Sequence, residues 1–376
     1  MYGSKVLMKT RIKVLQVINT LNTAGAERLV CTIAESMNRS EIQTDVLVLN
    51  GVETGFMRTL EAAGVRVIRL GSNEYNPWLI YKLRPYLEAY DIVHVHLFPA
   101  QYWVAIAKYL FKSKAHLVTT EHSTFNFRCK YKLTTWSDRK MYSQYEAITC
   151  ISPATLNFIR HRAPSSVRTV LIENGIDVAL FSQAKSDRAV VLPNVPANAF
   201  VLMQVARFKE EKNQIDLIKV LAHLPADIHA VFVGDGPMRK HCESLAKDLN
   251  VEERAHFLGK REDIPSLLAV ADIVVMPSLW EGFGLSAVEG MAAHKPVLAS
   301  NVAGLAQVVE DESLLFPVND VETMAGRIIK LYKNDELRMR VGEECYQRAQ
   351  KYDVRFMLDN LWKLYSQLED GDTTSN

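Results

Sequence analysis

Two glutamates, Glu281 and Glu289, are separated by seven residues in the segment SLWEGFGLSAVEGMAAH and are the first candidates for chemistry in this sequence. Carboxylates accept hydrogen bonds from vicinal hydroxyls, so one of them is suited to a sugar ring and the other to a ribose. The alternative for Glu289 is structural, because a carboxylate near a helix N-terminus complements the helix dipole and stabilises the helix by under roughly 1 kcal/mol.

The residues between these glutamates predict an anion site. The pattern indicates a strand in DIVVMPS, a glycine-rich loop in LWEGFG and a helix in LSAVEGMAAH. The backbone amides of Phe283, Gly284 and Leu285 then lie at the helix N-terminus, where N–H groups lack intrahelical partners and favour a phosphate. One carboxylate is therefore expected on each side of a phosphate site.

Two cations and a glycine follow other strands of the same half. Arg207 comes just after the strand FVLMQVA, and Lys212 follows five residues later, where the next helix begins. Loop cations are usually only solvated, but this pair is also placed to bracket a diphosphate, Arg by its fork and Lys as a point charge. Gly234 directly follows the strand in HAVFVGDG and opens a turn of the nucleotide-binding kind, although neither G-x-G-x-x-G nor a Walker sequence is present.

The first half offers a glycine and three histidines at strand ends. Gly25 opens a helix after the first strand, so a ligand is able to approach its backbone, although an ordinary turn uses such a glycine as well. His122 closes the strand HLVTTEH, where it could touch a substrate hydroxyl or a reacting centre. His94 and His96 alternate within DIVHVHL and share one face. A metal pair is conceivable, but no third ligand is near, so we favour histidines whose hydrogen bonds are satisfied within the protein.

Alternating strands and helices along nearly the whole chain must position these residues. Strand candidates begin at Arg11, Thr44, Val65, Asp91, His116 and Ala147, and then at Phe200, His229, Ala255, Asp272 and Lys295. This rhythm predicts βαβ units and an α/β fold of two doubly wound, Rossmann-like domains, in which ligands bind beyond the carboxyl ends of the strands. Segment 181–200 lacks clear periodicity, so we place the domains at residues 1–185 and 186–352, followed by a terminal segment, 353–376.

Length and composition agree with a two-domain globular enzyme. The 376 residues exceed what one hydrophobic core usually serves, and no stretch approaches the apolar length of a transmembrane helix. The segment MYGSKVLMKTRIKVLQVI lacks an uninterrupted apolar run, so we expect no secretory signal and a cytoplasmic protein. The five cysteines are scattered, without a C-x-x-C pair, and are expected to be mostly buried hydrophobes.

The charge is divided unevenly along the chain. Residues 1–180 carry 22 basic and 14 acidic side chains, a balance of +8, and the remainder carries 22 and 29, a balance of −7. The densest basic stretch, residues 108–140, interleaves aromatic side chains such as Tyr109 and Trp136 with lysine and arginine. Such a stretch suits an anionic lipid surface, where each nearby cation adds on the order of 1 kcal/mol. A solvated basic face is an equally weighted alternative, and no nucleic-acid partner is expected.

The segment EGFGLSAVE resembles the E-x7-E motif of retaining glycosyltransferases of family four, which have the two-domain GT-B fold. Other segments resemble this family in the same order between about residues 11 and 350: AGAER, DIVHVH, TTEH, CISPAT, IENGID, VARFKEEKN, VGDGP, FLGKREDIPSLLAVADIVVMPS and KPVLASNVAG. One departure is Ala24, which stands where the family has the first of two glycines. The segment YDVRFMLDNLWKLYSQL resembles the helix that in this fold returns to the first domain.

The resemblance implies an acceptor domain at 1–185, a nucleotide-sugar donor domain at 186–352, and retaining transfer in a central cleft. Glu281 would bind sugar hydroxyls, Glu289 the ribose, and Arg207 with Lys212 the diphosphate; His122 would contact the donor sugar near the reacting carbon. The catalytic residues would be His122, Glu281, Arg207 and Lys212, and the donor-binding residues Gly25, Gly234, Phe283, Gly284, Leu285 and Glu289.

The same resemblance implies a UDP- or GDP-sugar donor and a glycan or lipid-linked acceptor, as in polysaccharide synthesis at the inner face of a membrane. The sequence has no D-x-D at a strand end, only Asp370-Gly371-Asp372, so we expect no catalytic metal and no other cofactor. Two alternatives are a sugar-nucleotide epimerase of the same fold, which would convert the donor without acceptor, and a non-catalytic scaffold, which would not need its charged donor-site positions filled.

Overall fold

The computed structural model describes residues 11–22, 25–38, 41–123 and 132–371. These residues form two compact units, one that ends at Glu173 and resumes at Met357, and one that extends from Asn174 to Phe356. The domain boundary therefore lies about twelve residues before the predicted residue 185, and the return to the first unit begins at Met357 instead of residue 353. Residues 174–185 belong to the second unit because helix α7 (Val178–Ser182) packs against its helices and Ile176 forms a bridge with Asp353.

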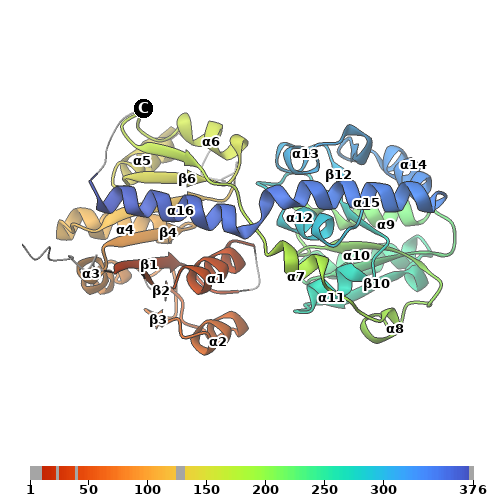
Figure 1. Ribbon diagram of the computed structural model, residues 1–376, viewed down its shortest axis with the longest axis horizontal. Coiled ribbons are helices and arrows are strands. Elements are labelled where there is room, and N and C mark those ends of the chain that lie inside the picture. The colour runs from red at the N-terminus through yellow and green to blue at the C-terminus, as the bar shows by residue number, and fades with distance from the viewer. Residues whose placement is uncertain (1–10, 23–24, 39–40, 124–131, 372–376) are drawn as a thin grey trace, which may run out of the picture. The chain divides into compact units, whose positions relative to one another are not determined.

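The first unit is built on a seven-stranded parallel sheet (Figure 1). Its strands are β1 (Ile12–Ile18), β2 (Ile42–Val48), β3 (Val67–Arg69), β4 (Ile92–His96), β5 (His116–Glu121), β6 (Ala147–Cys150) and β7 (Arg168–Leu171), in the order β3-β2-β1-β4-β5-β6-β7. The order reverses direction between β1 and β4, which is where doubly wound sheets bind ligands. Six of these strands were predicted; β7 was missed because it is a short edge strand, none of whose four residues is fully buried.

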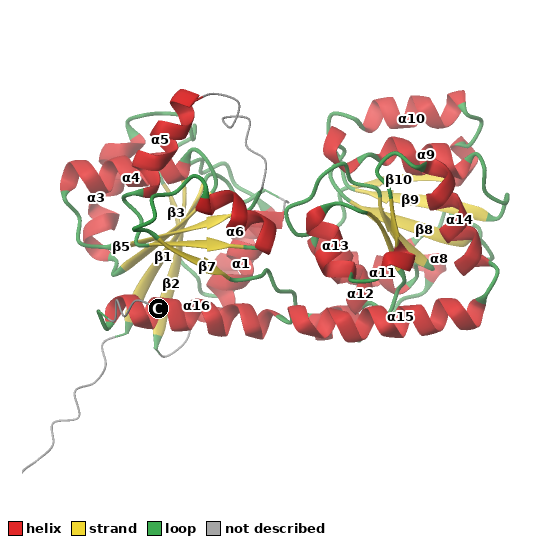
Figure 2. Ribbon diagram, turned by 90° about the horizontal axis from the view of Figure 1, so that it is seen from above, coloured by secondary structure: helices red, strands yellow, loops and turns green. Residues whose placement is uncertain are grey.

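Helices cover both faces of this sheet. They are α1 (Gly25–Met37), α2 (Gly55–Ala62), α3 (Leu79–Ala89), α4 (Ala100–Phe111), α5 (Lys132–Tyr142), α6 (Pro153–Arg160) and, from Met357 onward, α16 (Val354–Glu369). Figure 2 shows α16 and the pair α3 and α4 on opposite sides of the strands. On the α3–α4 side, Val93 and Val95 of β4 join a large apolar core, whereas His94 and His96 point to the other side, the one that bears Tyr365 of α16.

The second unit has a six-stranded parallel sheet with the same winding. Its strands are β8 (Phe200–Val205), β9 (Ile228–Val233), β10 (Ala255–Gly259), β11 (Ile273–Met276), β12 (Val297–Ser300) and β13 (Leu315–Phe316), in the order β10-β9-β8-β11-β12-β13. The central strands β8, β9 and β11 are buried on both faces, as is usual in parallel sheets. The two-residue β13 was not predicted, because a run that short gives no periodicity.

The helices of the second unit are α7, α8 (Arg188–Val191), α9 (Gln214–Leu221), α10 (Arg239–Asp248), α11 (Ile264–Ala269), α12 (Leu285–Ala292), α13 (Ala303–Val309), α14 (Val321–Tyr332) and α15 (Asp335–Ala349). In Figure 2, α9 and α10 lie on one side of the sheet, and α12 and α15 on the other. Segment 181–200, which lacks clear periodicity in the sequence, holds the end of α7 and all of α8. Both helices are too short to produce a helical pattern, but Asp177 and Asp187 cap them.

Two further findings concern the whole described chain. Across residues 11–22, 25–38, 41–123 and 132–371, no helix combines the length and the apolar character needed to cross a membrane. Cys31, Cys150, Cys242 and Cys345 are free and buried, which confirms the prediction for these four. Cys129 lies outside the described residues.

Candidate functional site

The predicted helix N-terminus after β11 is present. The chain leaves β11 at Met276, crosses a loop and enters α12 at Leu285, with Gly284 as the N-cap at φ +99°. An added Cβ at Gly284 would lie 2.6 Å from Leu305 Cδ2, so both the backbone angle and the packing require glycine. Ala287 and Val288 donate their amides to Gly284 O, while the amides of Phe283, Gly284 and Leu285 donate to no described residue. These three donors remain available to an anion.

Lys212 and Glu281 form an ion pair at this site, between Nζ and Oε2. Lys212 ends a 3-10 turn (Glu210–Lys212) before α9, and its carbonyl accepts from Gln204 Nε2 at 2.7 Å, which anchors the turn to β8. Glu281 lies in the loop after β11, and its backbone packs on Gly304 so closely that a Cβ there would overlap the Glu281 carbonyl. The side chains are 21% and 16% exposed, so a ligand is able to reach both. The structure therefore brings together the cation and the carboxylate that were predicted for a diphosphate and a sugar.

Arg207 is exposed beyond the end of β8, and its guanidinium bonds to no described residue. Gly234, directly after β9, has φ +136°, and an added Cβ would overlap the carbonyl oxygen of Ala206. Gly236 packs in the same way on Phe208. The two glycines therefore hold the backbone segment that presents Arg207, a structural role that the sequence did not indicate. Strands β8 and β11, which precede Arg207 and Glu281, flank the switch point of the sheet.

Glu289 and Phe283 lie deeper than the other predicted residues. Glu289 is in the second turn of α12, is only 3% exposed, and is not free of interactions. The Phe283 side chain is buried edge-on against Tyr352, with ring centroids 5.3 Å apart, so its backbone amide alone is placed for a ligand. The ribose contact of Glu289 stays a prediction.

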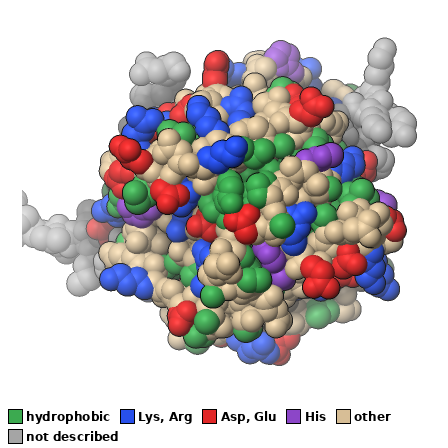
Figure 3. Space-filling model, turned by 90° about the vertical axis from the view of Figure 1, so that its right-hand side faces the viewer, with side chains coloured by type: hydrophobic (Ala, Val, Ile, Leu, Met, Phe, Trp, Pro, Cys, Tyr) green, Lys and Arg blue, Asp and Glu red, His purple; other side chains and the backbone are tan. Residues whose placement is uncertain are grey.

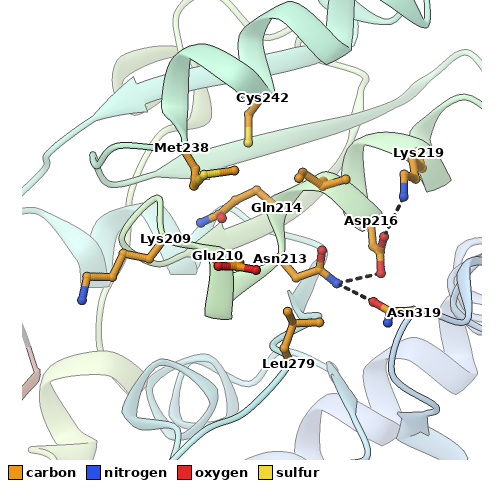
Figure 4. Close-up of a pocket in the computed structure, with 11 residues that line it drawn as sticks. Lys209, Glu210, Asn213, Gln214, Asp216, Lys219, Met238, Cys242, Leu279 and Asn319 are labelled. Carbon is orange, nitrogen blue, oxygen red and sulfur yellow. Dashed lines mark hydrogen bonds and ion pairs between the residues drawn. The ribbon is translucent and has the colours of Figure 1, made fainter. Parts of the chain in front are cut away.

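A cavity of about 250 Å³ lies beside the Lys212 turn and is shown in Figure 4. Asn213, in a left-handed conformation at φ 48°, directs its side-chain amide to Asp216 at 2.7 Å and to Asn319 at 3.4 Å. The volume of the cavity lies below the range of roughly 300–1,000 Å³ typical of small-molecule sites, and none of the predicted site residues lines the cavity. We therefore assign Asn213 the role of fixing the turn that carries Lys212.

In the first unit, the predicted residue His122 lies next to two buried histidines, His94 and His96. It follows β5, and its Nε2 lies 3.2 Å from His96 Nδ1. Burial lowers the pKa of His122 to about 4 and that of His94 to about 3, and it lowers the pKa of His96 well below its usual value. All three imidazoles are therefore neutral at pH 7. Gly25, the other predicted residue of this unit, is the exposed first residue of α1.

His94 and His96 share one face, as predicted, and stack with centroids 4.4 Å apart. Both rings are fully buried, and each nitrogen lies within 3.2 Å of a polar partner in the protein. Within residues 11–22, 25–38, 41–123 and 132–371, no group of three or more His, Cys, Asp or Glu side chains could hold a metal. These findings favour the hydrogen-bonded reading of the two histidines.

Sequence reasoning missed three partners of these histidines, Gln16, Thr120 and Tyr365, and also Thr149, which contacts Thr120. A signal for Gln16 was available, because a glutamine within the apolar strand IKVLQVI must find a buried partner. No local pattern connects Tyr365 to the site, since 271 residues separate it from His94.

The basic stretch 108–140 is only partly described, because residues 124–131, with Arg128 and Lys130, lie outside the described residues. Lys108 Nζ is held by Ala115 O and Glu146 Oε1, at 3.0 and 3.1 Å. Tyr109 and Trp136 are 71% and 63% exposed. The acidic second half shows no matching concentration of charge on the face in Figure 3, where basic and acidic side chains are interspersed.

Two family models match successive parts of the chain. The model described as Glycosyltransferase Family 4 matches residues 23–180, and the model described as Glycosyl transferases group 1 matches residues 192–348. The chain is similar to N-acetyl-alpha-D-glucosaminyl L-malate synthase of Bacillus anthracis, 27% identical over 271 residues, which are 69% of each chain. It is also similar to UDP-Gal:alpha-D-GlcNAc-diphosphoundecaprenol alpha-1,3-galactosyltransferase of Escherichia coli, 25% identical over 76% of this chain and 77% of that relative.

Solved structures show the same fold. Anabaena HepE, in complex with UDP and glucose, superposes with a TM-score of 0.85 at 24% identity and covers 95% of this chain and 100% of its own. The sucrose-phosphate synthase of Thermosynechococcus elongatus superposes with a TM-score of 0.79 at 21% identity, over 96% of this chain and 100% of that chain.

Proposed function

Because the chain is a family-four glycosyltransferase with the GT-B fold, we propose that it transfers a hexose from a nucleoside-diphosphate sugar to a hydroxyl of a glycan or lipid-linked acceptor, with retention of the anomeric configuration. The observation that carries this proposal is the Lys212–Glu281 ion pair beside the open amides of α12. A cation, a carboxylate and unpaired N–H groups at one strand edge match the parts of a sugar diphosphate.

The positive groups of the second unit have a clear task in this reaction. Departure of the nucleoside diphosphate places negative charge on its terminal phosphate, and donors fixed beforehand stabilise that charge without reorganisation. Arg207, Lys212 and the N-terminus of α12 supply such donors. On binding, the diphosphate would draw Lys212 from Glu281, which frees the carboxylate to accept from sugar hydroxyls.

Retention follows if the acceptor hydroxyl attacks the anomeric carbon on the face that the diphosphate leaves. The bond from that carbon to the phosphate oxygen breaks as the bond to the acceptor oxygen forms, and the departing phosphate oxygen takes the proton of the acceptor. In this scheme no protein base is needed at the acceptor. His122, neutral at pH 7, contributes a hydrogen bond to a substrate hydroxyl instead of accepting a full proton.

The donor and acceptor classes are supported by the relatives. The Escherichia coli relative is named for a UDP-galactose donor and a lipid-diphosphate-linked acceptor, and HepE was solved with UDP and glucose. We extend these classes to this chain as a UDP- or GDP-sugar donor and a glycan or lipid-linked acceptor. The fixed cations support transfer without a metal, so we expect activity to persist in excess chelator.

The deciding experiment is a calorimetric titration with UDP, GDP, ADP and CDP, without added metal, on the native chain and on Glu289→Ala. Tight binding of one nucleotide, weakened at least about tenfold in the variant, supports the donor site and the ribose contact. A tenfold weakening corresponds to a loss of about 1.4 kcal/mol of binding free energy. Glu310→Ala is the matched control, since Glu310 pairs with Lys351 on the surface of the same unit. Binding of none of the four would contradict the proposal.

A second experiment separates transferase from epimerase. The chain is incubated with the nucleotide sugar that matches the bound nucleotide, with and without a membrane extract as acceptor source, and sugar and product are followed by NMR. Transfer with the anomeric configuration of the donor supports the proposal. Conversion of the donor without acceptor would establish an epimerase, and an inverted product would exclude the retaining mechanism.

We also propose that residues 108–140 make a peripheral contact with anionic lipid, which would bring a lipid-linked acceptor to the enzyme. Exposed Tyr109 and Trp136 and the basic side chains around them support this contact. Sedimentation with anionic and neutral liposomes at low salt tests it. Equal recovery with both liposomes would mean that the basic stretch is a solvated face.

A further inference from the structure

A row of buried polar side chains crosses the sheet of the first unit beneath His122. Its members come from β1, β4, β5, β6 and α16, and they are Gln16, His94, His96, Thr120, Thr149 and Tyr365. All six are at most 6% exposed, so solvent does not set their hydrogen-bond directions. We call this row the Tyr365 chain.

The far end of the Tyr365 chain has a defined direction. Thr149 Oγ1 donates to the carbonyl oxygen of Thr119 at 3.4 Å, and a carbonyl only accepts. The Thr149 hydroxyl proton is thereby used, so in the 2.6 Å contact between the two hydroxyls Thr120 is the donor. The Thr120 proton is then used in turn, and His94 Nε2 must donate to Thr120 Oγ1 at 2.7 Å.

The same logic continues through α16. With its proton on Nε2, neutral His94 accepts at Nδ1 from the Tyr365 hydroxyl, 2.6 Å away. Tyr365 Oη in turn accepts from Gln16 Nε2 at 3.2 Å. The other end of this amide, Gln16 Oε1, accepts from His96 Nε2 at 2.8 Å.

His122 is the last link. Since His96 carries its proton on Nε2, its Nδ1 accepts, and the donor across the 3.2 Å contact is His122 Nε2. In a neutral imidazole one nitrogen carries the proton, so His122 Nδ1 keeps a lone pair. This atom bonds to no described residue.

The opposite direction is one hydrogen bond short. If every proton shifted the other way and the Gln16 amide turned over, Thr149 would donate to Thr120 and the Thr119 carbonyl would lose its hydroxyl partner. The carbonyl keeps its place in the parallel ladder of β5 and β6, but the reversed arrangement makes one hydrogen bond fewer, so the observed direction is preferred. The preference originates at Thr149, several side chains away from His122.

We propose that the Tyr365 chain fixes His122 as the tautomer protonated at Nε2, so that Nδ1 is presented as a hydrogen-bond acceptor for a substrate hydroxyl. Tyr365, Gln16 and Thr149 are thereby positioning residues. The contact of Nδ1 with substrate rests on the proposed function, but the tautomer does not. The other tautomer would present an N–H to the same hydroxyl and compete with the donors that bind the sugar oxygens.

The direct test is NMR of the full chain labelled with ¹⁵N-histidine, with the His122 signals assigned by their loss in His122→Gln. We expect a protonated Nε2 and a bare Nδ1 at pH 7. In Tyr365→Phe the link between Gln16 and His94 is cut, and we expect signals of both His122 tautomers. Tyr145→Phe is the matched control, because Tyr145 is also buried and donates to a carbonyl, that of Gln101, at 2.7 Å. An Nδ1-protonated His122 in the native chain, or an unchanged tautomer in Tyr365→Phe, would overturn the proposal.

An isosteric change at the far end provides a second test if Tyr365→Phe does not fold. Thr149→Val removes the group that sets the direction, so Thr120 becomes free to donate to His94, and the tautomer of His122 should again become mixed. The control is Thr44→Val in β2, because Thr44 Oγ1 is buried without a partner and does not belong to the Tyr365 chain. A native tautomer in Thr149→Val would show that the direction is not transmitted.

Kinetics distinguish this inference from the proposed function. Tyr365→Phe is expected to lower kcat roughly tenfold with little change in donor KM, since a positioned hydrogen bond is lost while the diphosphate site is intact. If the tautomer changes as expected but transfer proceeds at the native rate, the Tyr365 chain stands and the contact of His122 with substrate is refuted.

Discussion

The two units have sheets of the same winding but place different chemistry at their carboxyl edges. In the second unit the strands that flank the switch point, β8 and β11, are almost wholly apolar, and the charged groups Lys212, Glu281 and Arg207 lie in the turns and loops that follow them. In the first unit the strands themselves carry the polar groups, and the histidines of β4 are fully buried. The second unit therefore carries its charged groups in partly exposed loops, whereas the first unit buries neutral, hydrogen-bonded groups within its strands.

The difference follows from the cost of burying charge. A lysine and a carboxylate that must exchange each other for a ligand need partial exposure, because a fully buried pair would not separate. A histidine that must stay neutral benefits from burial, which penalises its charged form. Charged groups are therefore suited to the partly exposed loops, and neutral histidines to the buried strands.

The largest effect is expected from acid, which acts on the buried histidines of the first unit. Because burial depresses the pKa of His94 and His96 below the ordinary 6.5, the unfolded chain binds more protons, and stability falls as the pH drops below about 6.5. Between pH 7 and pH 5 the two histidines together should lower the free energy of unfolding by about 4 kcal/mol. Urea unfolding at both pH values measures this loss.

The control for the acid experiment removes the histidine pair of the second unit. His229 Nδ1 and His256 Nε2 lie 2.9 Å apart, within hydrogen-bond distance, and burial lowers the pKa values of both rings as well. A variant with His229→Gln and His256→Gln should retain most of the loss. If the variant no longer responds to acid, the buried histidines of the first unit are not its source.

Lys212→Ala removes the cation of the ion pair with Glu281 in the second unit. We expect turnover to fall ~10²-fold or more, because a preorganised positive donor is lost from the leaving phosphate. Lys219→Ala is the control, since Lys219 pairs with Asp216 on α9 and is 48% exposed. Steady-state transfer rates decide, and a near-native rate for Lys212→Ala would refute its assignment.

Gly304→Ala should disturb the same ion pair through the backbone. Its Cβ would overlap the Glu281 carbonyl, so the loop must move, at a cost of roughly 1–3 kcal/mol in stability and with slower transfer. Thermal unfolding and transfer rates are measured together. Unchanged values for both would mean that the loop adapts without moving Glu281.

The smallest effect is expected from Gly326→Ala in α14, where an added Cβ meets nothing within 4 Å. Alanine should stabilise this helix by roughly 0.5–1 kcal/mol, because glycine loses more backbone freedom on folding. Transfer should be unaffected. A stability loss here would show that the second unit tolerates little change even away from its site.

Much of the fold was predictable from the sequence because parallel strands buried on both faces leave strong apolar runs, as in IVVM of β11. Lys212 and Glu281 were also predictable, since each lies in the turn or loop that follows such a strand. The position of the domain boundary was not, because it depends on the packing of the five-residue helix α7 on α12. The Tyr365 chain was equally hidden, because its members meet only after four strands and α16 have come together.

The return of α16 has a consequence for biosynthesis. The first unit needs residues from Met357 onward, yet the ribosome must first translate the whole of residues 174–356. At about 5–20 residues per second, this imposes a wait of roughly 10 to 40 seconds. Throughout that time the nascent first unit holds His94 and Gln16 without Tyr365. On the proposal above, His122 acquires its fixed tautomer only when the last helix arrives, so a prematurely released chain lacks the complete Tyr365 chain.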